Sequence, residues 1–159
     1  MTSESDAGLS PEMVQALLSQ DAAAQLKATV HVRERLSIKS SATDEFIKFG
    51  LVPRFVHFLE DSRHPELQCE AAKVLAKVAS GTTEQTQVVI DAGAVASLIS
   101  LLSSSNLDIA EQSVLALGNI AADSPQSVLN RNVVSPLLRY DDYSLCLICR
   151  LIHAPLQTL

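Results

Sequence analysis

The stretch LDIAEQSVLALGNIAA, residues 107–122, decides the fold. Apolar and small side chains recur in it at spacings of three or four, which is the period of one face of an α-helix. That face consists of Ile109, Ser113, Ala116, Leu117 and Ile120. The pattern predicts a long helix with this face buried, and Asp108 followed by Glu111 is spaced like a variant capping box at its start.

This stretch has two earlier counterparts in the chain. Residues 25–37 recur at 68–80 with an offset of 43, and residues 77–80 recur at 119–122 with an offset of 42. The recurrences predict long helices over residues 22–37, 65–80 and 107–122. Pro65 suits a first helical position, because the backbone N–H that proline lacks has no intrahelical partner there.

Between the long helices lies a second kind of element, which opens at a Gly or Asn and continues as a short apolar helix. The openings Gly50, Gly93 and Asn132 follow one another at offsets of 43 and 39. Glycine accepts a positive φ without a Cβ clash, so Gly50 and Gly93 suit tight corners between helices. We expect the short helices over residues 51–60, 94–103 and 133–139.

Periods near 40 residues are typical of helical solenoids. A unit of two or three helices cannot bury its apolar stripe alone, so neighbours stack into one core with a concave surface lined by the long helices. We therefore predict an all-α solenoid of about three repeats, over residues 10–58, 59–102 and 103–139. We expect residues 1–9 to be disordered and residues 140–159 to form a divergent C-terminal helix or cap.

The composition bounds the function of the chain. Hydrophobic residues make up 47% of the 159 residues and aromatic residues only 4%, with no Trp, so the core must be aliphatic. A net charge of −6 argues against nucleic-acid and anionic-membrane partners and permits a basic one. Three cysteines without a secretory leader favour a reducing compartment, the cytoplasm or nucleus.

Enzyme signatures are absent from the sequence, which has no glycine-rich phosphate loop, no HExxH and no G-x-S-x-G motif. Cys146 and Cys149 form a single CxxC, which cannot by itself complete a tetrahedral zinc site. We expect two packed thiols, no catalytic residue, no metal and no cofactor. A small metal- or thiol-dependent enzyme that uses Cys146, Cys149 and His153 is the alternative from another class.

A family resemblance indicates which class of solenoid the chain forms. The segments ASGTTEQTQVVIDAGA (79–94), EQSVLALGNIAADSP (111–125) and GLVPRFV (50–56) closely resemble the first armadillo repeats of importin alpha. The similarity extends over residues 10–138, and the last twenty residues do not match. The resemblance implies an armadillo-repeat right-handed superhelix, truncated relative to the family.

The resemblance also implies a function. Importin alpha proteins are adaptors that hold a nuclear localisation signal extended along the concave groove. Their inner helices carry Trp and Asn four residues apart, hence on one face. The Trp rings hold signal lysines partly by cation–π attraction, and the Asn amide clamps the peptide backbone.

Carried over to this chain, the family groove is kept only in part. Four positions match the loop after the second repeat, which forms the floor of a lysine pocket in the family: Ser80, Gly81, Thr82 and Thr86. Three match groove positions of the third repeat: Gln112, Asn119 and Asp123. The remaining three depart from it, with Lys73 and Leu115 at Trp positions and Lys77 at an Asn position.

These departures predict weaker binding of a basic peptide at the second repeat, because each lost cation–π contact costs about 0.5–2 kcal/mol. Our first hypothesis is an importin-alpha-like adaptor for localisation-signal cargo in the cytoplasm and nucleus, with weakened or altered specificity. The alternative is a non-transport armadillo scaffold for a different, acidic or neutral, peptide. Residues 1–10 contain no Lys or Arg, which weighs against an importin beta contact.

Overall fold

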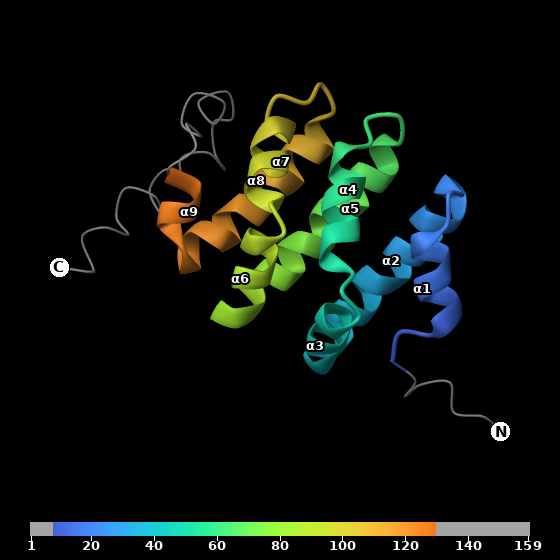
Figure 1. The fold of residues 1–159 in the computed structure, drawn as a ribbon. Coiled ribbons are helices and arrows are strands. Elements are labelled where there is room, and N and C mark those ends of the chain that lie inside the picture. The colour runs from blue at the N-terminus through green and yellow to red at the C-terminus, as the bar shows by residue number, and fades with distance from the viewer. Residues whose placement is uncertain (1–7, 130–159) are drawn as a thin grey trace.

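The structure is a computed structural model that describes residues 8–129, and every regular element in this range is an α-helix (Figure 1). The helices are α1 (Pro11–Leu18), α2 (Ala22–Ile38), α3 (Ser41–Lys48), α4 (Val52–Glu60), α5 (Pro65–Ala79), α6 (Thr83–Asp91), α7 (Ala94–Leu101), α8 (Leu107–Asp123) and α9 (Pro125–Leu129). The predicted all-α solenoid is confirmed.

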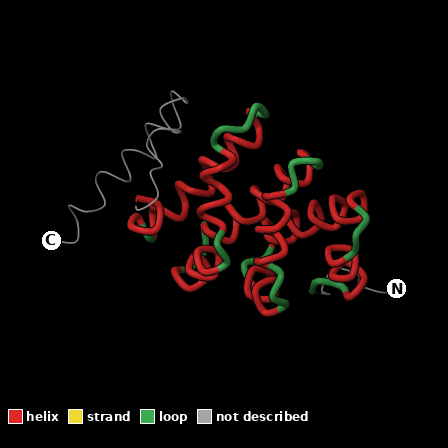
Figure 2. The backbone as a smooth tube through the Cα atoms, turned by 45° about the horizontal axis from the view of Figure 1, so that its top comes forward, coloured by secondary structure: helices red, strands yellow, loops and turns green. Residues whose placement is uncertain are grey.

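The helices follow a repeated order of two short helices and one long one. The groups α3–α4–α5 and α6–α7–α8 both have this order, with α1 and α2 before them and α9 after them. The long helices α2, α5 and α8 pack in a row, α5 lying between the other two (Figures 1 and 2). The solenoid therefore presents the long helices of successive repeats side by side.

The predicted helices occur close to their expected bounds. The three long helices and the short helices α4 and α7 begin and end within about two residues of the prediction. The first short helix of each unit, α3 and α6, was not predicted from the sequence, and neither were α1 and α9. The predicted helix over residues 133–139, the cap over 140–159 and the pairing of Cys146, Cys149 and His153 lie outside the described residues.

Small side chains allow the long helices to approach closely. The predicted face of α8 is fully buried, as expected from its periodicity. The buried faces of α5 and α8 combine larger aliphatic side chains with seven alanines: Ala71, Ala72, Ala76, Ala79, Ala110, Ala116 and Ala121. The short helices supply larger groups, and the rings of Phe46 on α3 and Phe55 on α4 meet edge to face with centroids 5.0 Å apart.

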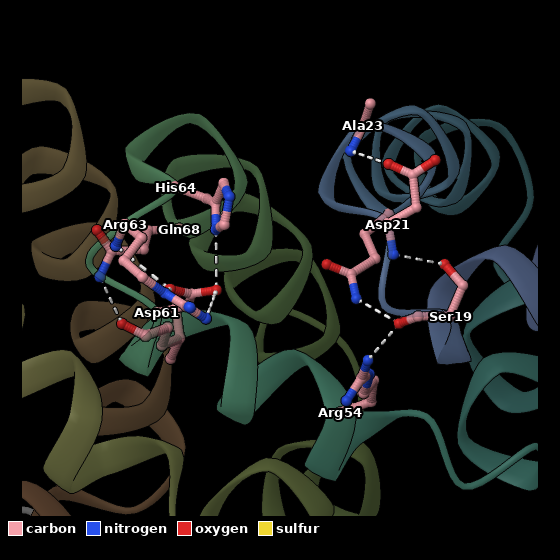
Figure 3. Close-up of polar contacts among 10 residues, drawn as sticks. Ser19, Asp21, Ala23, Arg54, Asp61, Arg63, His64 and Gln68 are labelled. Atoms are coloured by element: carbon pink, nitrogen blue, oxygen red, sulfur yellow. Dashed lines mark hydrogen bonds and ion pairs between the residues drawn. The ribbon is translucent and has the colours of Figure 1, made fainter.

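Polar side chains satisfy the carbonyl groups at the helix ends. Arg54 on α4 donates from Nη2 to the carbonyl of Ser19, just after α1, at 2.9 Å (Figure 3). Gln25 on α2 donates to the same carbonyl at 2.6 Å. Its repeat counterpart Gln68 on α5 donates to the carbonyl of Leu59 near the end of α4 at 2.8 Å. The sequence repeat thus carries a repeated hydrogen bond between a long helix and the short helix before it.

The helix starts confirm one expected cap and correct another. Pro65 is the first residue of α5, as predicted. The cap of α8 is Asn106, whose Oδ1 accepts from the backbone N–H groups of Asp108 and Ile109, so the predicted pairing of Asp108 with Glu111 is wrong. Asp108 is instead the second residue of the helix, where its negative charge interacts favourably with the helix dipole.

Gly50 and Gly93 adopt the left-handed conformation that the corners between short helices require. Their φ values are +67° and +84°, and a Cβ added at either would meet nothing within 4 Å. The predicted corners are confirmed, and backbone conformation alone explains the glycines.

Replacing Gly93 by alanine should therefore lower the free energy of unfolding by about 1–2 kcal/mol, the cost of a Cβ in the left-handed region. Gly93→Asn should lose less, because Asn tolerates this region better. Urea unfolding followed by circular dichroism measures both. Equal stability of Gly93→Ala and the wild type would contradict the assigned backbone conformation.

Candidate functional site

The exposed faces of α2, α5 and α8 form one surface, called here the long-helix surface. The candidate positions on α5 are Lys73 and Lys77, and those on α8 are Gln112, Leu115, Asn119 and Asp123. Lys77 and Asp123 are exposed, and Leu115 is 48% exposed. The helix periodicity thus places residues of both units on the same side of the molecule.

Glu70 on α5 joins two cations on this surface. Its Oε2 accepts from Arg33 Nε of α2 at 2.7 Å, and its Oε1 accepts from Lys73 Nζ at 2.8 Å. The Glu70 side chain is only 15% exposed. Lys73 is therefore held by a neighbouring carboxylate and does not project freely into solvent.

The charges of this cluster stabilise one another. Burial acts to raise the pKa of Glu70, but hydrogen bonds from Lys73 and Arg33 outweigh it and hold that pKa below its usual value. The hydrogen bond from Lys73 to Glu70 raises the pKa of the lysine. Sequence reasoning missed Glu70 and Arg33. The i, i+3 spacing of Glu70 and Lys73 was a local signal, whereas Arg33 is distant in sequence and offered none.

The two polar candidates at the end of α8 make contacts with neighbouring helices. Asn119 donates one N–H of its amide to the carbonyl of Ala76 on α5 at 2.9 Å. The contact orients the amide and leaves its oxygen and second N–H without a partner in the described structure. Asp123 accepts a hydrogen bond from the Thr83 hydroxyl of α6 at 2.8 Å through one carboxylate oxygen.

The segment between α5 and α6 is a short turn closed by its own side chains. Ser80 donates its hydroxyl to the carbonyl of Lys77 at 2.7 Å. Thr82 and Gln85 form a capping box at the start of α6. A Cβ on Gly81 would come within 1.8 Å of the Gln85 amide oxygen, so glycine leaves room for that cap.

Thr86 does not lie in this turn, contrary to the sequence-based expectation. It belongs to α6 and has no exposed surface. Its hydroxyl bridges back to the carbonyls of Ala79 and Thr82, both at 3.1 Å. Thr86 therefore holds the turn in place from the buried side, while Ser80, Gly81 and Thr82 form the exposed part of the turn.

Residues 8–129 show neither a metal-binding cluster nor a membrane-spanning helix. They contain no group of three or more His, Cys, Asp or Glu side chains placed to hold a metal ion. No helix in the same range has the length and apolarity to cross a bilayer. Burial raises the pKa of the Cys69 thiol, so less of it is present as the nucleophilic thiolate at neutral pH.

Comparison with known proteins identifies the repeat. Residues 82–122, which span α6, α7 and α8, match the model of the Armadillo/beta-catenin-like repeat. A crystal structure of computationally designed armadillo repeat proteins for modular peptide recognition superposes with a TM-score of 0.80 at 28% identity, covering 88% of this chain and 63% of that one. A designed armadillo repeat protein in complex with the peptide (KR)4 gives a TM-score of 0.79, 28% identity, and coverage of 91% and 69%. The chain is an armadillo-repeat protein.

Sequence relatives narrow this class. Importin subunit alpha-1b of Oryza sativa subsp. japonica is 48% identical over 133 residues, 81% of this chain and 25% of the relative. Importin subunit alpha-2 of Arabidopsis thaliana is 48% identical over 132 residues, 80% of this chain and 25% of the relative. The chain is a homologue of the importin alpha subunits in their armadillo region, and it spans about a quarter of the length of these relatives.

The Glu70 cluster should give folding a pH dependence. A carboxyl group whose pKa is lowered on folding stabilises the folded state at pH values above its ordinary pKa, near 4.5. This stabilisation is lost as the pH falls through the lower pKa that the group has in the folded state. Between pH 6 and pH 3, wild type should therefore lose about 1 kcal/mol more unfolding free energy than Glu70→Gln. Urea unfolding across this range measures the difference.

A matched control for this experiment is Glu12→Gln, which removes an exposed carboxylate on α1 that has no ion pair in the described structure. It should keep the pH dependence of wild type. If Glu70→Gln kept it as well, the cluster would contribute nothing to stability.

Proposed function

We propose that this chain is an importin-alpha-like adaptor that binds an extended peptide on the long-helix surface, as cargo for protein import into the nucleus. The proposal rests on the contact of Asn119. The Ala76 carbonyl orients its amide, and the amide keeps one N–H donor and its oxygen acceptor available. An extended peptide offers a matching backbone acceptor and donor at each residue. The adaptor works by binding, in the cytoplasm and nucleus, and requires no cofactor.

The relatives support a peptide as the ligand. The sequence relatives are named as importin alpha subunits, and a designed armadillo neighbour was solved with the peptide (KR)4. The surface of α8 offers carboxylates to such a peptide, because Asp108, Glu111 and Asp123 are all exposed. A basic segment is therefore the ligand that the electrostatics of α8 favour.

The second repeat alters the specificity of the groove. Lys77 is exposed and has no ion-pair partner in the described structure, and Lys73 lies one helical turn before it. A basic peptide residue over α5 would meet this positive charge, and the Trp faces that hold lysines in the family are missing. We infer weakened binding of basic signals at the second repeat and retained binding at the third.

The exposed Lys77 also favours a second candidate function, a non-transport scaffold for an acidic or neutral peptide. Titration of the labelled peptides (Lys-Arg)4 and (Glu-Asp)4, followed by fluorescence anisotropy at fixed ionic strength, separates the two functions. The adaptor proposal expects tighter binding of (Lys-Arg)4. Tighter binding of (Glu-Asp)4 would overturn it in favour of the scaffold.

Restoring the family residues on α5 should strengthen the binding of a basic peptide. We expect the double variant Lys73→Trp with Lys77→Asn to bind (Lys-Arg)4 at least ~1 kcal/mol more tightly, because it adds a cation–π face and removes repulsion. Lys48→Glu on α3, which lowers the net charge by the same two units, is the control. Unchanged affinity in a folded double variant would show that α5 does not contact the peptide in the family manner.

Removing the amide of Asn119 should weaken peptide binding. Asn119→Ala loses two hydrogen bonds to the peptide backbone, for an expected cost of about 1–2 kcal/mol in binding (Lys-Arg)4. The same anisotropy titration measures this cost, with Gln15→Ala on α1 as control. A folded Asn119→Ala variant with wild-type affinity would contradict the role of this amide.

A further inference from the structure

A cleft of about 340 Å³ lies where the three long helices meet, away from Lys77 and Asn119. Leu26 and Val30 of α2 and Cys69 of α5 give it apolar walls, and all three are partly buried. Its polar lining consists of Glu66 and Glu70 of α5, with Asp108 and the capping residue Asn106 at the start of α8. The cleft exists only because successive repeats stack.

The acidic groups of this cleft differ in how they are satisfied. Both oxygens of Glu70 are already engaged by Arg33 and Lys73. The carboxylates of Glu66 and Asp108 are exposed and take part in no ion pair in the structure as described. Two negative charges therefore face the cleft without a counter-charge.

The cations near the cleft do not supply that counter-charge. Arg33 and Lys73 are bound to Glu70. Arg63, which lines an adjoining cleft together with Glu66, is held by Asp61 through its Nε at 2.9 Å (Figure 3). The cleft keeps a net negative charge over an apolar floor, and this combination fits the aliphatic stem and cationic head of a basic side chain.

We propose that this cleft is a subsite for one lysine or arginine side chain of the bound peptide, an inference that rests on the peptide-binding function proposed above. The stem of that side chain lies against Leu26 and Val30, and its charge lies between Glu66 and Asp108. Along α5, Glu66 and Lys77 are separated by eleven residues, or about 16 Å. The groove therefore accepts a basic residue at the starts of α5 and α8 and repels one near Lys77.

The position of Cys69 in the cleft wall allows occupancy to be measured directly. The full chain is treated with N-ethylmaleimide at mildly alkaline pH, because burial raises the pKa of the Cys69 thiol, with and without (Lys-Arg)4. Peptide mapping by mass spectrometry follows the alkylation of Cys69 alone. The subsite predicts that the peptide slows this alkylation in proportion to its occupancy, and that (Glu-Asp)4 does not.

Charge removal tests the two carboxylates. The double variant Glu66→Gln with Asp108→Asn should bind (Lys-Arg)4 about fivefold more weakly. Glu12→Gln with Asp91→Asn, which removes the same net charge elsewhere, should change affinity less than half as much. Both acids also lie in the first turn of a helix, where their negative charge stabilises the helix through its dipole. Thermal unfolding therefore accompanies each titration, because a purely structural role would lower the unfolding midpoint without changing the protection of Cys69.

The outcomes separate the subsite from the function on which it rests. Binding of (Lys-Arg)4 with no protection of Cys69, or equal losses in the two double variants, would overturn the subsite and leave the adaptor proposal standing. Absence of any binding by (Lys-Arg)4 would overturn the adaptor proposal and the subsite with it.

Discussion

The packing of α5 against α2 and α8 is the contact on which the rest of the structure depends. The buried faces combine alanines with larger aliphatic side chains, and the alanines lose no rotamer freedom on burial and take up little space between the helices. No single repeat can bury such a face alone, so each long helix requires its neighbours. The surface that they present jointly, and every contact between repeats on it, follows from this packing.

The polar contacts between the long helices give that surface its particular charge pattern. Glu70 accepts from Arg33 across the contact of α2 with α5, and Asn119 donates to Ala76 across the contact of α8 with α5. Both contacts orient a side chain that is then presented at the surface. Acidic groups gather at the starts of α5 and α8, while Lys73 and Lys77 make the second half of α5 basic. The charge that a bound peptide meets on the long-helix surface therefore depends on the position along each helix as well as on the repeat.

The sequence predicts the long helices well and the contacts between them poorly. The pattern over residues 107–122 predicted α8 and its buried face, because a periodicity sustained over several helical turns indicates which side chains are buried. The helices α3 and α6 are only 8 and 9 residues long and are rich in polar side chains, so stacking rather than their own pattern determines them. Thr86 was expected in a loop because a family match locates a position without showing whether its side chain is buried. The ion pair of Arg33 with Glu70 joins residues 37 apart, and no local spacing announces it.

The proposed function requires that the exposed faces of the three long helices bind a peptide. Its most direct test is the amide NMR spectrum of the isotope-labelled chain during titration with (Lys-Arg)4. We expect the largest shift changes on the exposed face of α8, around Asn119, and at the start of α5, around Glu66, with little change on α4 and α7. Changes concentrated on α4 and α7, or spread evenly over the described helices, would contradict the proposed function.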